Sequence, residues 1–178
     1  MHELTGRLAE EKDLDAIEEI YSQIHIAEAD GRSQTGWEAG IYPIRATAQE
    51  ALAQGTLYIF ETAGAPVGTA IIDHDQKPFY ARIPWSCTVP NEQVLVLHTL
   101  AIDPRCARRG YGAAVLAFYE ALARRCGCTW LRLDTGLRNR PARAFYRSRG
   151  FRELEAVEVR CSETSVMPLL MLEKRVEE

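Results

Sequence analysis

The chain has 178 residues, 47% of them hydrophobic and 26% charged, and a formal net charge of −4 at pH 7. This length and composition suit one ordinary globular domain, 1–178, whose core needs neither disulfides nor a metal. No apolar run approaches the roughly 18 residues of a membrane span, and the start of the chain lacks a basic segment followed by an apolar one. We therefore expect a cytoplasmic protein with no membrane partner.

The first part of the chain is predicted to hold two helices and three strands. Apolar residues at three- and four-residue spacings predict a helix over 13–29. Thr47 is expected to cap a short helix that ends near Gly55. Strands are predicted at Leu4–Ala9, Thr56–Thr62 and Pro66–Asp73, the last two forming a hairpin.

Two segments are rich in aromatic residues and have no regular period. Trp37 and Tyr42 lie between the two predicted helices, and Tyr80 and Trp85 lie in the long segment His74–Asn91, which contains three prolines. Because long irregular segments often carry function, these four side chains are candidates for substrate binding. For Trp37 and Tyr42, the alternative is that they only cover the edge of the core.

The central pattern is a strand, a turn and a helix that opens on glycines. An apolar strand from about Gln93 to Ile102 ends at Asp103-Pro104, and Gly110-Tyr-Gly112 begins a helix that ends at Gly127. Unpaired N–H groups and a partial positive charge at a helix N-terminus favour a phosphate or pyrophosphate. The nearby cations that can reinforce such a site are Arg105, Arg108 and Arg109.

The rest of the chain completes an α+β pattern with a mixed sheet. A strand over 129–135 follows the glycine-led helix, which implies a parallel pair with a right-handed crossover. Asn139 is expected to cap a short helix that Gly150 ends. Two last strands are predicted at 151–160 and 165–173. On the glycine-led helix, the apolar face is predicted to contain Tyr111, Val115, Phe118, Leu122 and Cys126.

Charge and cysteine content narrow the ligand class. Residues 105–152 contain 12 arginines and two acidic residues, so anion binding is concentrated there. These arginines are not interleaved with base-stacking aromatics, which favours a phosphorylated cofactor over nucleic acid. The five cysteines form no C-x-x-C pair, which favours reduced thiols and no metal site. They are Cys87, Cys106, Cys126, Cys128 and Cys161.

The stretch Leu97–Phe151 resembles the GNAT (Gcn5-related N-acetyltransferase) superfamily. The acetyl-CoA signature of that family is similar to Leu100-Ala-Ile102-Asp-Pro104 followed by Ala107-Arg-Arg-Gly110-Tyr-Gly112, although Ala107 stands where the family usually has Arg or Gln. A second family element, Asn-x-x-Ala-x-x-x-Tyr followed by Gly-Phe, is matched in full. It consists of Asn139, Ala142, Tyr146, Gly150 and Phe151. No Lys-Ser/Thr follows Gly110-Tyr-Gly112 and no G-x-G-x-x-G is present, which disfavours a P-loop or dinucleotide site.

The resemblance implies a GNAT fold, with about seven strands in a mixed central sheet flanked by about four helices. It also implies acetyl-CoA as cosubstrate, bound by backbone groups of the central strand and by the helix start. The residues that this likeness assigns to the cosubstrate, together with the neighbouring arginines, are Leu100, Ala101, Ile102, Arg105, Arg108, Arg109, Gly110, Tyr111, Gly112, Ala113, Asn139, Ala142 and Tyr146. Shorter likenesses at Thr35–Pro43, Val96–Leu100 and Leu133–Thr135 point to a subgroup of small bacterial members and name no substrate.

The resemblance also suggests catalytic roles. Tyr146 occupies the position of the family's proton donor to the departing thiolate, and a phenol is protonated at neutral pH. For the general base, His98 and Glu92 compete; His98 is also a candidate to contact the substrate. His98 can equally be a neutral core histidine, and Glu92 a surface carboxylate.

We therefore expect an acetyl-CoA-dependent N-acetyltransferase in which a primary amine of a small molecule attacks the thioester directly. The alternatives are an acetyltransferase that acts on protein or peptide N-termini and a non-catalytic acyl-CoA-binding or sensor domain. Family members often dimerise, so the resemblance also allows a homodimer.

Overall fold

Strand β4 (Val94–Ile102) contributes residues to both of the compact units into which the chain divides. The computed structural model describes residues 4–160 and 166–177. The first unit contains Met1–Ser33, Trp37–Ile72 and His98–Tyr119; the second contains Gln34–Gly36, Asp73–Leu97 and Glu120–Glu178. The first four residues of β4 thus belong to the second unit and its last five to the first.

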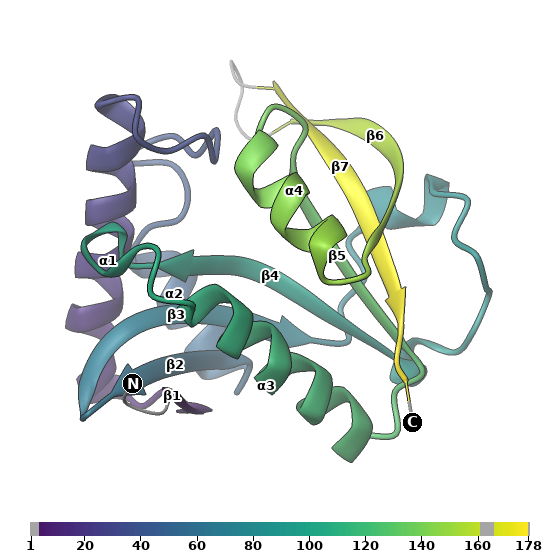
Figure 1. The fold of residues 1–178 in the computed structure, drawn as a ribbon, viewed down its shortest axis with the longest axis horizontal. Coiled ribbons are helices and arrows are strands. Elements are labelled where there is room, and N and C mark those ends of the chain that lie inside the picture. The colour runs from purple at the N-terminus through teal and green to yellow at the C-terminus, as the bar shows by residue number, and fades with distance from the viewer. Residues whose placement is uncertain (1–3, 161–165, 178) are drawn as a thin grey trace. The chain divides into compact units, whose positions relative to one another are not determined.

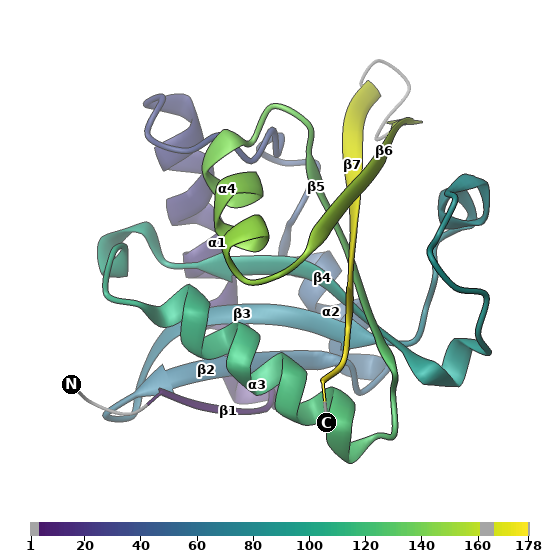
Figure 2. The same ribbon diagram turned by 45° about the vertical axis from the view of Figure 1, so that its right-hand side comes forward.

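The first unit is built on antiparallel strands. The strand β1 (Leu4–Leu8) pairs with β2 (Leu57–Thr62), and β2 pairs with β3 (Ala65–Asp73), so that the three lie side by side (Figure 2). Side chains pack tightly against β1 on one face of this sheet: a Cβ added to Gly6 would lie 2.7 Å from the ring of Phe60 and 2.9 Å from that of Phe118. Glycine at this position therefore lets Phe118 of α3 (Tyr111–Arg125) pack edge-on against Phe60.

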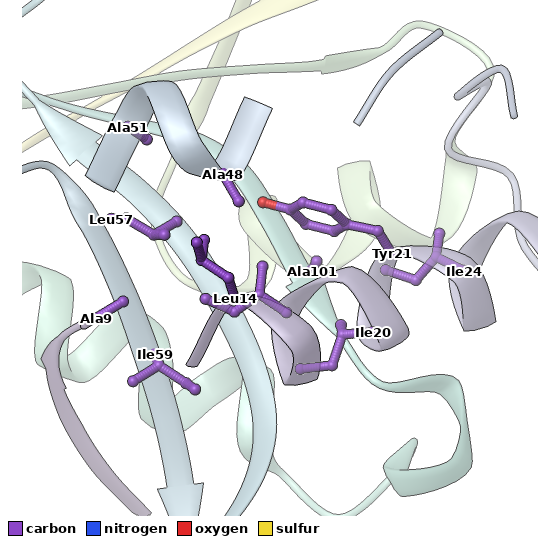
Figure 3. Packing of buried hydrophobic residues seen from close by; sticks show 11 residues of the cluster. Ala9, Leu14, Ile20, Tyr21, Ile24, Ala48, Ala51, Leu57, Ile59 and Ala101 are labelled. Carbon is purple, nitrogen blue, oxygen red and sulfur yellow. The ribbon is translucent and has the colours of Figure 1, made fainter. Parts of the chain in front are cut away.

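Helices α1 (Leu14–Ala29) and α2 (Arg45–Ala53) cover the opposite face of these strands. The apolar residues of α1 recur at helical spacing and are buried, as the period predicts. Figure 3 shows their side chains together with those of β2 and α2. The members of this core are Ala9, Leu14, Ile17, Ile20, Tyr21, Ile24, Ala48, Ala51, Leu57, Ile59 and Ala101.

The second unit combines parallel and antiparallel pairing. Val94–Leu97 of β4 runs parallel to β5 (Trp130–Gly136), which pairs antiparallel with β7 (Val166–Arg175). In turn β7 pairs antiparallel with β6 (Arg152–Arg160). Helix α4 (Arg140–Ser148) lies beside β5 and the β6–β7 pair (Figure 1). The Asn139 side chain accepts a hydrogen bond from Ala142 N at 3.2 Å, which confirms the predicted N-cap.

Two buried charged residues, one on β5 and one on β7, hold the segment between β3 and β4 in place within the second unit. Arg132 of β5 donates to the Cys87 carbonyl at 3.0 Å and to Gln76 Oε1, and its guanidinium stacks 4.1 Å from the Trp85 ring centroid. Glu173 of β7 is 1% exposed and accepts hydrogen bonds from the backbone and the hydroxyl of Ser86. This segment is therefore a packed cover of the strands rather than a loose loop.

In the described ranges, the strand order β1-β2-β3-β4-β5-β7-β6, with four α-helices, confirms the predicted α+β class and the seven-stranded mixed sheet of the GNAT fold. None of the described helices is both long enough and apolar enough to span a membrane. The one-domain prediction for 1–178 stays a prediction. Cys161 and Ser165, the first residue predicted for the last strand, lie outside the described residues.

Two details of the prediction were wrong. Thr47 does not cap α2; the helix begins two residues earlier, and the Thr47 hydroxyl accepts a hydrogen bond from Ile44 N at 3.1 Å from the third helical position. On α3, Cys126 lies beyond the helix and is exposed, whereas Leu116 and Tyr119 are buried. Both errors concern the position of single residues within a helical turn, which depends on how the helix packs against the rest of the protein.

Candidate functional site

Thr99 interrupts the regular backbone of β4. Its φ is +48°, although β-branched residues strongly disfavour the left-handed region. The Thr99 hydroxyl is hydrogen-bonded to the Tyr42 hydroxyl, which comes from the segment between α1 and α2. Such strained residues persist where the surroundings fix them, and they gather at functional sites. The strain lies in the Leu100–Ile102 neighbourhood that the sequence assigned to the cosubstrate.

The exposure of side chains alternates along the second half of β4. His98, Leu100 and Ile102 are half-buried, whereas Thr99 and Ala101 are buried. This pattern agrees with the expectation that His98 and Leu100 share a strand face. Gly68 of β3 permits a close approach on this strand, because an added Cβ there would lie 2.9 Å from the Ala101 carbonyl oxygen.

The turn between β4 and α3 has the backbone of an anion site. Arg108 and Gly110 have φ values of +63° and +83°, and the N–H of Ala114 is the first to donate within the helix, to the Gly110 carbonyl at 3.1 Å. Helix geometry therefore leaves the N–H groups of Tyr111, Gly112 and Ala113 to other partners. An added Cβ at Gly110 would meet no atom within 4 Å, so glycine is required by its φ and not by crowding.

The three arginines proposed for this turn are not equivalent. Arg105 donates to Asp103 at 2.7 Å and to Glu19 at 3.0 Å, so its charge is already matched by two carboxylates. Among the residues that the structure describes, Arg108 and Arg109 make no ion pair, and both are exposed. Arg108 and Arg109 are thus the cations left for a phosphate, and Arg105 stabilises the turn. The fit to a pyrophosphate is good despite the exposed Ala107.

Tyr146 lies in α4, where only 7% of its surface is exposed. Its ring packs against Phe145 and, edge-on, against Phe151 at a centroid distance of 5.8 Å. Burial, with a contribution from the negative charge of Asp134, raises the pKa of Tyr146 well above that of an ordinary phenol. Tyr146 is therefore protonated at every physiological pH, as a hydrogen-bond or proton donor must be.

The two aromatic residues proposed from the His74–Asn91 segment are packed in the core of the second unit. Tyr80 is 1% exposed and donates through its hydroxyl to Asp134 Oδ2 at 2.7 Å. Trp85 donates to the Tyr80 carbonyl and covers Arg132. The expectation that Tyr80 and Trp85 close over a substrate is therefore corrected: both side chains are used in packing and in holding polar groups of β5.

The first-unit pair Trp37 and Tyr42 is placed differently. The two rings meet edge-on at 6.0 Å between centroids, and Trp37 packs on the core of the first unit. Tyr42 is 36% exposed, with its hydroxyl on Thr99. Tyr42 is therefore tied to the strained residue of β4 while part of its ring remains accessible, and its role in substrate binding stays a prediction.

The two base candidates differ in position along the chain. His98 lies on β4 next to Thr99. Glu92 is exposed in a 3₁₀ turn (Asn91–Gln93) that precedes β4. Both residues stay candidates for the general base.

Sequence reasoning missed two features. One is Thr99, since a threonine within a run of strand formers gives no signal of a left-handed φ. The other is a pocket of about 230 Å³ in the second unit, formed by Gln34–Gly36, the end of β5 with the residues that follow it, and the start of β7. The single glycine and the polar residues of 34–36 signalled only a loop. Within the described ranges no cluster of His, Cys, Asp or Glu could hold a metal ion.

Comparison with known proteins identifies the family. The acetyltransferase (GNAT) family model matches residues 14–151, a range that includes most of both units. An uncharacterized N-acetyltransferase of Methanocaldococcus jannaschii is 28% identical over 100 residues, which are 56% of this chain and 40% of the relative. The chain thus matches about two fifths of the length of that curated relative.

Solved structures share the fold. A GNAT-family acetyltransferase from Streptococcus agalactiae has a TM-score of 0.82 at 18% identity and covers 98% of this chain and 96% of its own. A Salmonella typhimurium protein solved with its cofactor acetyl-CoA has a TM-score of 0.66 at 19% identity, over 98% of this chain and 95% of its own. At these identities the likeness concerns the fold.

Proposed function

The chain belongs to the acetyltransferase (GNAT) family, and from this we propose that it transfers an acetyl group from acetyl-CoA directly to a primary amine of a small molecule. One observation carries the proposal: the left-handed turn at Arg108 and Gly110, which opens the start of α3 to an anion in the family's signature position. When bound, acetyl-CoA supplies an activated thioester carbon.

We assign the phosphates of the cosubstrate to the start of α3. The N–H groups of Tyr111, Gly112 and Ala113 and the partial positive charge of the helix end are suited to an anion. Arg108 and Arg109 add charge without breaking an existing ion pair, and they take the place of the side chain that Ala107 lacks. The backbone of Leu100–Ile102 would bind the acyl end, with Asn139 and Ala142 contributing from α4.

Tyr146 would protonate or hydrogen-bond the departing thiolate. A thiol has a pKa of about 8.5, whereas burial holds the pKa of Tyr146 above the ordinary phenol value of about 10. Complete proton transfer from tyrosine is therefore uphill. A short hydrogen bond that stabilises the developing negative charge is the more favourable contribution of this residue.

His98 is our candidate for the group that accepts the proton of the attacking amine. Imidazole has a reference pKa of about 6.5, which suits a base at neutral pH. The half-buried position of His98 on β4, one residue before the strained Thr99, supports the assignment. The alternative to His98 is Glu92, acting directly or through a water molecule.

A turnover assay tests the function. Release of free CoA from acetyl-CoA is measured with a panel of primary amines and with peptides that have free N-termini, and acetyl-CoA binding is measured by calorimetry. Turnover with small amines is expected. Turnover with peptides alone would favour a protein N-terminal acetyltransferase, and tight acetyl-CoA binding without any turnover would favour a sensor domain.

A further inference from the structure

We propose that the second-unit pocket recognises amine acceptors that also carry an anionic group such as a carboxylate, and that Arg138 binds this group. The inference rests on the proposed acetyl transfer and specifies its acceptor. The pocket has a volume of about 230 Å³, below the roughly 300–1,000 Å³ typical of drug-sized ligands. Its size therefore suits a compound comparable to an amino acid.

Two glycines build the pocket by allowing close backbone approach. A Cβ added to Gly136, at the end of β5, would lie 2.9 Å from the Thr35 carbonyl oxygen. Gly36 has a φ of +74°, and a Cβ there would lie 3.1 Å from Met167 Sδ of β7. Residues 34–36 thus pack in the second unit although both flanking segments belong to the first. Residues 34–36 form one wall of the pocket.

Among the described residues that line the pocket, Arg138 is the charged one and none is acidic. The contrast with Arg143 is informative: Arg143 donates to Glu153 at 2.9 Å, and Arg147 shares the same carboxylate. Within the described part of the chain, Arg138 has no carboxylate at ion-pair distance, and it is exposed. Its planar guanidinium is therefore free to bind a carboxylate through two parallel hydrogen bonds.

The backbone on both sides of Arg138 is fixed. Leu137 N donates to the Pro168 carbonyl at 2.8 Å, and the Leu137 carbonyl accepts from Arg143 at 3.0 Å. Asn139 N donates to the Gly136 carbonyl at 2.8 Å, and its side chain caps α4. Arg138 is thus held between two anchored residues, so binding an anion orders only its side chain.

The other residues that line the pocket suit the part of the acceptor that carries no charge. Leu137, Val166, Met167 and Pro168 present apolar groups that suit a hydrocarbon side chain or linker. The anionic group of the acceptor pairs with Arg138 and offsets the repulsion that a simple alkylamine or a polyamine would experience in this pocket.

The test compares matched acceptors. Leucine, methionine and glutamate are each supplied as the free α-amino acid, as the α-amide and as the decarboxylated amine, and CoA release is measured. The free acids are expected to have the lowest KM. In Arg138→Gln we expect KM for the acids to rise about 10- to 100-fold, the size of a lost charge-assisted hydrogen bond, while KM for the amides changes little. Arg138→Lys should lie between, and Arg140→Gln, an exposed neighbour outside the pocket lining, should match the parent.

A binding experiment separates this inference from the proposed function. In the presence of CoA, calorimetry compares N-acetylleucine with N-acetylleucinamide, a comparison that needs no turnover. Tighter binding of the carboxylate that disappears in Arg138→Gln supports the inference even if no amine is acetylated. Equal binding of the two ligands, an unchanged preference in Arg138→Gln, or a loss confined to acetyl-CoA affinity would overturn it.

Discussion

The Tyr42 hydroxyl is hydrogen-bonded to the Thr99 hydroxyl, so the residue of β4 with a left-handed backbone is held by a side chain 57 positions earlier in the sequence. A left-handed φ in a β-branched residue is unfavourable by roughly 1–2 kcal/mol. A single hydrogen bond contributes about 0.5–1.5 kcal/mol. The bond is therefore large enough to offset much of the strain and to orient the neighbouring peptide groups of β4.

We expect Tyr42→Phe and Thr99→Val each to lower kcat about 10-fold, because each removes one partner of this bond. The double variant should lose no more than either single variant, since the two substitutions remove the same interaction. Thr99→Ser should retain the parent rate. Steady-state kinetics with the best amine of the panel measures these effects, and fully additive losses would show that the bond does not act as a unit.

Gly110→Ala tests the anion site at the start of α3. The φ of +83° disfavours alanine by roughly 1–2 kcal/mol, while space for its Cβ is open. Gly31→Ala is a matched control, because Gly31 has a φ of +71° and also has no atom within 4 Å of an added Cβ. Urea unfolding should show similar losses of stability in both variants. Calorimetry should show weaker acetyl-CoA binding, by about tenfold, in Gly110→Ala alone.

Tyr146→Phe should lower kcat by about 10²-fold or more, in the range of a lost hydrogen-bond donor to developing negative charge, and leave acetyl-CoA affinity unchanged. Because phenylalanine fills the same buried volume, stability should change by less than about 1 kcal/mol. The raised pKa of Tyr146 also predicts a pH–rate profile in which this residue causes no loss of activity below about pH 10. Loss of acetyl-CoA affinity in Tyr146→Phe would instead assign this tyrosine to cosubstrate binding.

Asp13 links stability to acidic pH. Hydrogen bonds from Arg7, at 2.7 and 2.9 Å, hold the pKa of the buried Asp13 carboxyl below its ordinary value. The unfolded chain therefore binds a proton at Asp13 more readily than the folded protein does. The stability that the ionised Asp13 carboxylate contributes is present above the unfolded pKa of about 3.9. It is lost as pH falls through the folded value.

Asp13→Asn should therefore lower the free energy of unfolding at pH 7 by about 1–3 kcal/mol, with the difference from the parent shrinking below pH 4. Urea unfolding at a series of pH values measures this. Glu11→Gln removes an exposed carboxylate from the same turn and should change stability little. A difference between Asp13→Asn and the parent that stays constant into strong acid would contradict the linkage.

Local patterns in the sequence were sufficient to predict the helices and strands, but not every residue of the candidate site. Asn139 has a side chain that caps a helix, and the glycines at 110 and 150 have positive φ where a turn was expected. Tyr80 was misjudged because proline-rich composition indicates an irregular segment without indicating whether it is buried. Its burial depends on Asp134, 54 residues away. The pocket wall at 34–36 likewise depends on contacts with Gly136 and Met167 that no local pattern contains.

The anchoring of the segment between β3 and β4 has a consequence for substrate access. Ser86 is bound to Glu173 and the Cys87 carbonyl to Arg132, so releasing this segment exposes two buried charged groups at once. Its amide hydrogens should therefore exchange with solvent at rates close to those of the neighbouring strands. Insertions here should reduce stability before they alter turnover, in contrast to a mobile flap, whose length can vary with little effect on folding.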